Sequence, residues 1–161
     1  MANNKQFTLD IKKFIKETTA KITFIRKKVA FDVFVRVINR TPVDQGYARG
    51  GWQCSLAAAS TRSTKVKDTA AGMNPMSIAS GPTVEKMALK VTKLSMRYPS
   101  IFLSNNVPYI DMLEDGLYSK ESTTGKTING FSSQAPSGMV KVTLEEFPYL
   151  FAVDAREGAG I

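Results

Sequence analysis

The stretch Thr41-Pro42-Val43-Asp44-Gln45-Gly46-Tyr47-Ala48-Arg49-Gly50-Gly51-Trp52 joins a long basic segment to the first predicted strand. Pro42 restricts the residue before it to extended backbone, so a preceding helix must end here. Asp44 can hydrogen-bond to backbone two residues further on, and Gly46 can adopt a positive φ, which together predict a turn. The stretch contains no histidine, no metal-ligand spacing and no phosphate-binding loop. It therefore indicates an architectural role rather than catalytic chemistry.

A long helix is predicted upstream of this 41–52 turn, from an N-cap at Thr8 toward Asn39. One helical face is outlined by residues at steps of three and four: Ile11, Ile15, Thr18, Ile22, Ile25, Val29, Val33 and Val37. At about 1.5 Å per residue, a helix of ~30 residues spans roughly 45 Å, more than a small core covers. We expect its end near Ile38 to be buried and its start to project and pack on another chain. A break could occur near Thr18-Thr19, because two β-branched threonines weaken a helix slightly.

Two strands and two shorter helical segments are predicted downstream of the turn. Trp52 to Ala58 and Ser100 to Asn105 have the composition of strands. Val84 to Leu94 has the apolar spacing of a short helix. A helical turn from Tyr109 to Leu113 should end at Gly116.

A last helix is predicted to begin at Pro136, because proline suits the first turn of a helix. Its apolar side would contain Met139, Val142, Leu144, Phe147, Leu150 and Phe151. Two polar segments, at about 60–82 and 117–134, are predicted to be extended loops, the second with room for a small hairpin. These elements predict a single α+β domain over residues 1–161. Its small, mainly antiparallel sheet would be flanked by a long N-terminal helix, a middle helix and a C-terminal helix.

The composition limits the classes of function. The 161 residues include no histidine and one cysteine, which excludes a Cys/His nucleophile, a zincin site and a zinc finger. No nucleophile–base pair can be identified in the sequence, so we expect no enzyme activity, no cofactor and no metal. Cys54 is expected to be a buried small hydrophobic residue of a protein made in a reducing cytoplasm. We expect neither a membrane span nor a signal peptide, because the apolar runs are too short.

The charge is distributed unevenly along the chain. Residues 1–67 carry 14 Lys/Arg and 4 Asp/Glu, a net charge of +10, whereas residues 68–161 carry 8 Lys/Arg and 10 Asp/Glu, a net charge of −2. The basic half could face nucleic acid or an acidic partner. Copies could also pack with the basic part of one against the acidic part of the next, or the basic helix face could simply be solvated.

Three further motifs follow the 41–52 turn in order: Leu103-Ser104-Asn105-Asn106-Val107-Pro108-Tyr109, Leu113-Glu114-Asp115-Gly116 and Gln134-Ala135-Pro136-Ser137-Gly138-Met139-Val140. Together the four resemble the tail-completion, or neck, proteins of tailed bacteriophages. In that family a TPVDTG-x-a-R-x-n-W turn follows a long first helix, s-N-n-a-P-Y leads into l-E-y-G, and q-A-P-x-G-M opens the last helix. The resemblance covers about residues 10–150. It departs at Gln45, where threonine is usual, and at Asp115, where an aromatic residue is common.

The resemblance implies a structural virion protein in the neck, assembled in the host cytoplasm. Such proteins form a homo-oligomeric ring between the connector, or adaptor, and the tail, and leave an axial channel for transient passage of genomic DNA. Six-fold symmetry is preferred and twelve-fold is the alternative. A ring contact is heterologous, so each subunit needs two different faces, which the basic and acidic halves fit. The two long loops are expected to contact connector and tail subunits, and no membrane is involved.

The resemblance marks these positions as structural: Thr41, Pro42, Asp44, Gly46, Arg49, Trp52, Asn105, Pro108, Tyr109, Glu114, Gly116, Pro136 and Gly138. Asp44 and Arg49 could form an ion pair that fixes the turn, or Asp44 could cap while Arg49 is solvated. Arg49 could equally contact a neighbouring subunit, where its planar fork suits a carboxylate. Glu114 is its candidate partner.

Four other side chains have structural interpretations with one alternative each. Trp52 is expected in the core, with an interface anchor as the alternative. Tyr109 should pack its ring at the strand end and hydrogen-bond its hydroxyl. Asn105-Asn106 should make turn bonds rather than read a base. Gly138 could let the last helix approach a neighbour closely or serve as a simple packing glycine.

The basic side chains of the long helix have three open interpretations. They could line a DNA channel, contact an acidic neighbour or form a solvated face: Lys12, Lys13, Lys16, Lys27 and Lys28. Phosphate contacts give sequence-independent, salt-sensitive affinity, which would impede DNA passage if it were strong. The competing hypothesis for the whole chain is a non-specific nucleic-acid-binding module that uses this basic helix.

Overall fold

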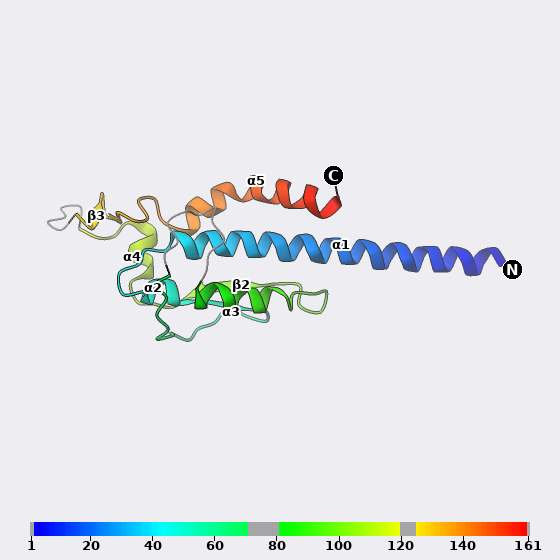
Figure 1. Cartoon of the computed structure of the whole chain (residues 1–161), viewed down its shortest axis with the longest axis horizontal. Coiled ribbons are helices and arrows are strands. Elements are labelled where there is room, and N and C mark those ends of the chain that lie inside the picture. Colours follow the sequence, from blue (N-terminus) through cyan, green and yellow to red (C-terminus); the bar gives the residue numbers. More distant parts are fainter. Residues whose placement is uncertain (1, 71–80, 120–124, 161) are drawn as a thin grey trace.

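The computed structural model describes residues 2–70, 81–119 and 125–160. Helix α1 (Ala2–Arg40) runs along the long axis of the molecule, and the β3–β4 region (residues 127–132) extends beyond its C-terminal end (Figure 1). Helix α5 (Val140–Ala159) lies along one side of its C-terminal half, and α3 (Pro82–Val91) with strand β2 (Phe102–Asn105) lies along the other (Figure 1). The N-terminal half of α1 extends beyond both layers. The α+β prediction is confirmed, with the small antiparallel sheet and α3 on one side of α1 and α5 on the other.

Helix α1 begins earlier than predicted and ends where Pro42 requires. Thr8 does not cap it but lies inside it, where its hydroxyl donates to the Asn4 carbonyl at 2.7 Å. The helix is continuous through the expected break at 18–19. β-branched residues lower helix propensity by only about 0.5–0.7 kcal/mol each, too little to interrupt a helix with good formers on both sides. At its end the Thr41 hydroxyl donates to the Val37 carbonyl at 2.8 Å.

The sheet consists of two antiparallel strands. Strand β1 (Trp52–Ser55) pairs with β2 so that Trp52 is opposite Asn105. β1 is shorter than predicted, because the Ser55 hydroxyl donates to the Ala58 carbonyl and closes a turn there. A four-residue helix, α2 (Tyr47–Gly50), which was not predicted, lies between the turn and β1.

The main core lies between α1, α3 and the sheet. Its buried residues are Val35, Ile38, Val84, Met87 and Val91, and Trp52 and Cys54 pack against them. α3 occupies Pro82–Val91 rather than 84–94, although Leu94 is buried as its spacing predicted. Burial raises the pKa of the Cys54 thiol to about 11, which fits a half-buried packing residue.

A second, smaller core joins α4 (Ile110–Asp115) to the start of α5. It is built from Ala48, Leu113, Ala135 and Met139. α4 ends at Gly116 as predicted. The expected hairpin is present as β3 (Thr127–Ile128) and β4 (Phe131–Ser132), joined by an Asn-Gly turn with both residues at positive φ.

The two predicted loops are described in part. Residues 60–70 contain neither helix nor strand, which agrees with the loop prediction. The remainder of that loop, 71–80, and residues 120–124 of the second loop lie outside the described residues. α5 begins at Val140 rather than Pro136, because Gly138 adopts a φ of +81° that no helix can include. Pro148 lies inside α5 at an exposed position.

Candidate functional site

The four motifs of the sequence lie together at one end of the molecule, opposite the projecting N-terminus (Figure 1). Three sets of hydrogen bonds join them: Asn105 Nδ2 to the Ala48 carbonyl, Gln134 to both backbone groups of Val43, and Glu114 to the backbone N–H groups of Met139, Val140 and Lys141. The first motif therefore contacts the second and the fourth, and the third contacts the fourth. Segments separated by up to 91 residues form one connected structural unit. We call this unit, made of the four motifs, the motif cluster.

Arg49 is the buried centre of this cluster. Its side chain is wholly buried, and its guanidinium donates to Asn39 Oδ1 at 3.1 Å and to the Ala70 carbonyl. Its Nε lies 3.8 Å from Asp68 Oδ1. Burial lowers the pKa of Arg49, and the charge of Asp68 opposes that shift. Arg49 therefore makes its contacts within its own chain, because a fully buried side chain cannot reach a neighbouring subunit.

The two predicted partners of Arg49 are both wrong. Asp44 is exposed, and its Oδ1 lies 3.7 Å from Lys126 Nζ. Glu114 points to the start of α5 instead. The actual partner, Asp68, lies in the polar 60–82 loop, where nothing in the local pattern distinguished it from a solvated charge.

Asp68 ties three segments together. Its backbone N–H donates to the Gly46 carbonyl at 3.0 Å, and its carboxylate accepts from the N–H groups of Ala70 and Thr83, both at 3.1 Å. Gly46 has a φ of +81°, and a Cβ there would lie 2.7 Å from the Asp68 carbonyl oxygen. Glycine is therefore required at the turn for two independent reasons, its backbone angle and the close approach of the loop.

Glu114 caps the N-terminus of α5. Its two carboxylate oxygens accept from the backbone N–H groups of Met139, Val140 and Lys141 at 2.8–2.9 Å. The first N–H groups of a helix have no partners within the helix, and a carboxylate there also interacts favourably with the helix dipole. Gly138 packs directly on Glu114, since a Cβ would lie 2.6 Å from its backbone carbonyl oxygen and 3.0 Å from its carboxylate Oε1. Gly138 is thus a packing glycine within the chain.

The expected roles of Trp52 and Asn105-Asn106 are confirmed. Trp52 is half-buried on the main core, and its indole N–H donates to the Thr41 hydroxyl at 2.7 Å. Asn105 Oδ1 accepts from the Val107 N–H at 3.1 Å, which is a turn bond just before Pro108. Asn106 donates to carbonyls of the 60–62 segment. None of these amides is left available to read a base.

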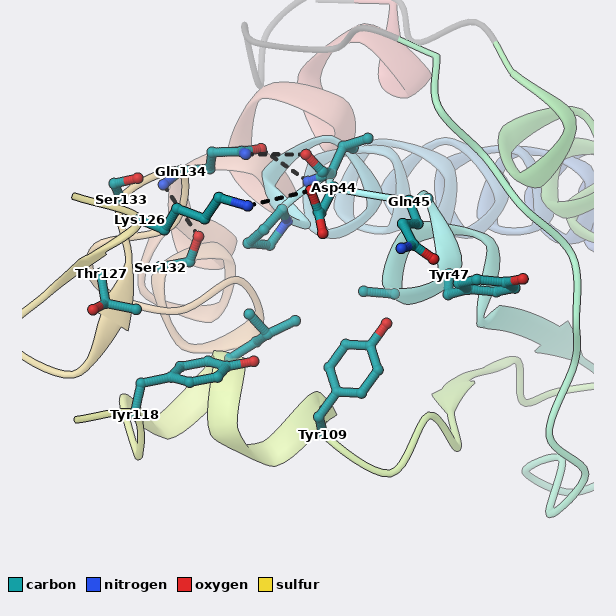
Figure 2. A pocket seen from close by; sticks show the side chains of 15 residues that line it. Asp44, Gln45, Tyr47, Tyr109, Tyr118, Lys126, Thr127, Ser132, Ser133 and Gln134 are labelled. Carbon is teal, nitrogen blue, oxygen red and sulfur yellow. Dashed lines mark hydrogen bonds and ion pairs between the residues drawn. The ribbon is translucent and has the colours of Figure 1, made fainter. Parts of the chain in front are cut away.

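A cleft of about 510 Å³ opens beside the 41–52 turn, between that turn, α4 and the hairpin (Figure 2). Three tyrosines line it: Tyr47, Tyr109 and Tyr118. The exposed Asp44–Lys126 pair closes one side of it. An aromatic cleft with a charged rim suits a polypeptide partner, because tyrosine supplies large contact area together with a polar tip.

Tyr109 differs from its prediction in one respect. Its side chain points toward the 41–52 turn, as Figure 2 shows, but its hydroxyl makes no hydrogen bond with any residue that the structure describes. Burial raises its pKa, as do Tyr118, Asp44 and Tyr47 nearby. The hydroxyl is thus available to a molecule that enters the cleft.

The five basic candidates separate into two groups. Lys12, Lys13 and Lys16 are exposed on the projecting half of α1. Lys28 instead bonds Asp154 at 2.6 Å, Asp32 at 3.1 Å and Glu157 at 3.2 Å, and these carboxylates raise its pKa although burial opposes them. Lys28 therefore fixes α5 to α1 and is not available to phosphate.

Lys27 is half-buried next to this ion-pair cluster, between the projecting and the packed parts of α1. Two more ion pairs fix α5 further along, where Arg36 and Arg40 bond Glu146 at 3.0 and 2.6 Å. Sequence periodicity alone did not show that these basic side chains serve packing of α5.

The described residues contain no group of three or more His, Cys, Asp or Glu side chains that could hold a metal ion. No described helix is both long and apolar enough to cross a membrane. No protein-family model, curated protein or solved structure matches this chain.

Proposed function

We propose that this chain is a structural neck protein of a tailed bacteriophage, which forms a ring between the connector and the tail and leaves a channel for DNA. One observation carries the proposal: the four motifs of the resemblance, spread over residues 41–140, form a single hydrogen-bonded cluster. These bonds support the interpretation that the four motifs are parts of one structural unit, as the resemblance requires.

Two further features support an assembly role. The motif cluster presents the tyrosine-lined cleft and the β3–β4 hairpin at the end opposite the projecting helix, so the two ends of the molecule offer different surfaces (Figure 1). A ring that docks to two different neighbours needs subunits whose two ends differ in this way. In this role the cleft receives a segment of the connector or tail, and no reaction takes place.

The competing function is non-specific nucleic-acid binding through Lys12, Lys13 and Lys16. These side chains are exposed, but they are not interleaved with aromatic residues on the same helix face, as single-strand binding surfaces commonly are. Duplex binding through three lysines would be weak and strongly salt-dependent.

The proposal is tested in particles rather than with the isolated chain. Phage carrying a C-terminally tagged copy should show label only at the head–tail junction in negative-stain images. Loss of the gene should give filled heads and separate tails. If purified particles lack the chain, or normal joined particles form without it, the proposal fails. A filter-binding salt series on the purified chain tests the competing function, which requires submicromolar affinity that disappears with salt.

A further inference from the structure

The projecting half of α1 carries an apolar face whose large side chains are left exposed by the part of the chain that the structure describes. Its members are Phe7, Ile11, Phe14, Ile15 and Ile22, all exposed. Phe7 and Phe14 are the most exposed of them, at 66% and 67%. With 3.6 residues per turn, all five lie within one third of the helix circumference, and Thr18 lies at their centre. We call this face the stripe.

The stripe leads into an apolar groove on the body of the molecule. The same face of α1 continues as Ile25, Val29 and Val33, which form the floor of a groove of about 300 Å³. Phe147 and Phe151 of α5 form one wall. The other wall is formed by Leu94, Pro99 and Ile101. Stripe and groove are thus successive parts of one surface along one helix.

We propose that two copies of this chain pair in antiparallel orientation through α1, so that the stripe of each lies in the groove of the other. Stripe and groove lie on the same face, so two copies must face each other to bring them together. A two-fold axis near Thr18 does this and makes the contact twice with identical residues. Neighbours in a ring of similarly oriented copies cannot make this contact, because their matching faces point the same way.

The apolar pattern of α1 is self-complementary in this orientation. With the axis near Thr18, Phe7 of one copy lies opposite the Val29 to Val33 region of the other, and Ile11 lies opposite the Ile25 to Val29 region. Ile22 meets Phe14 and Thr18. Phe7, Ile11 and Ile22 thus each meet apolar side chains of the other copy, and the small Thr18 side chain at the crossing permits close approach of the two helices.

The available area favours a second copy over a peptide or another small occupant. Five side chains that are 43–67% exposed leave on the order of 500 Å² of apolar surface in water, since aromatic side chains bury about 150–250 Å² each and isoleucine somewhat less. A stable interface needs about 800 Å² per partner. The stripe alone falls short of this, but a second copy covers stripe and groove at once. Phe147 and Phe151, 40% and 50% exposed, then supply much of the remainder.

Repulsion between the two basic helices should make the pairing stronger as salt increases. Residues 2–28 carry eight Lys/Arg and two Asp/Glu. Lys12, Lys13 and Lys16 lie on the helix face away from the stripe, so they do not enter the contact, but two antiparallel copies still repel each other. Added salt screens that repulsion and should strengthen the pairing. Salt would weaken nucleic-acid binding, so the two modes respond in opposite directions.

The pairing does not rest on the proposed neck function. It concerns the isolated chain in solution, where it covers a surface that would otherwise be exposed to water. If the chain does assemble in a neck, the pair must separate first. Pairing would therefore prevent ring contacts between copies until the connector is present.

A single new cysteine at the axis tests the geometry. Thr18→Cys should form a disulfide between copies under mild oxidation, because the two positions face each other. Lys16→Cys, on the opposite face, should remain a single chain. The natural Cys54 interferes little, since it is half-buried and its pKa is raised to about 11, and the unchanged chain is the control. Absence of the Thr18→Cys link, or equal linking through Lys16→Cys, would overturn the proposal.

Light scattering of the unchanged chain tests the stoichiometry. The expected mass is twice the 17.7 kDa of one chain, and association should strengthen as salt increases. Phe14→Glu should weaken association by at least about tenfold, as loss of a central aromatic contact does. Lys16→Gln, which changes the charge by the same amount, should not weaken it. A mass of one chain at all concentrations, or of many chains, contradicts the pairing, and neither result bears on whether the chain is present in phage necks.

Discussion

The motif cluster and the projecting half of α1 are stabilised in opposite ways. In the cluster, charged side chains such as Arg49, Asp68 and Glu114 are buried or bonded to backbone within the chain. In the projecting half, the phenylalanine side chains and Ile11, Ile15 and Ile22 are exposed. The fold thus encloses the charged side chains of the cluster, whereas it leaves the apolar side chains of the projecting helix exposed. The cluster therefore stabilises the single chain, and the projecting helix presents the surface that we propose pairs two copies.

This difference predicts how mutations act. Changes in the cluster should lower the stability of the isolated chain without any partner. Changes in the projecting half should leave that stability unaltered and act only on association. The predictions below run from the largest expected loss of stability to the smallest.

Asp68→Ala should cause the largest loss. The change leaves the Arg49 guanidinium buried without its carboxylate and removes the acceptor for the Thr83 N–H. Breaking one side of a buried ion pair costs about 3–5 kcal/mol. The free energy of unfolding from urea denaturation should fall by that amount. Asp44→Ala is the control, because its pair with Lys126 is exposed, and it should change the unfolding midpoint within error. Equal effects of the two changes would contradict the buried role of Asp68.

Glu114→Ala should have the next largest effect. Three N–H groups at the start of α5 lose their acceptor, and loss of a helix cap costs about 0.5–2 kcal/mol. The same denaturation measurement applies. Glu145→Ala is the matched control, since this exposed carboxylate lies on α5 itself. If Glu114→Ala is as stable as the parent chain, the capping role is wrong.

Much of the fold could be predicted because its signals are local. Pro42 ends α1 through its effect on the residue before it, and Gly116 ends α4 with a positive φ. The apolar spacing of Met87, Val91 and Leu94 located α3 and its buried face. Each of these statements depends on residues within one or two turns of one another.

The centre of the candidate site could not be predicted because its partners are distant in sequence. Arg49 bonds Asp68 from a polar loop without periodicity, and Glu114 caps a helix that begins 26 residues later. Pro136 was a plausible helix start, but Gly138 at positive φ delays the helix to Val140. Pairings of this kind depend on how the segments are brought together, and a single sequence carries no record of that.

The docking of α5 on α1 should depend modestly on pH through Glu146. Burial alone would raise the pKa of this carboxyl, but the guanidiniums of Arg40 and Arg36 outweigh burial and lower it. A group whose pKa is lower in the folded state stabilises the fold above its unfolded pKa, and that contribution is lost as the pH falls through the folded value. The melting temperature of the parent chain should therefore exceed that of Glu146→Gln at about pH 7 and approach it near about pH 3. A gap that widens in acid would reverse the assigned sign.

Removal of residues 2–17 should have the smallest effect on the isolated chain. These residues add helix but no contact with the body, and the exposed apolar side chains among them gain nothing from folding. At concentrations low enough to prevent association, the unfolding midpoint of the shortened chain should match that of the parent. At high concentration only the parent should gain stability, because binding to the folded state adds to it by mass action. A lower midpoint at high dilution would mean that the projecting helix stabilises its own chain, and the contrast between the two regions would then be one of degree only.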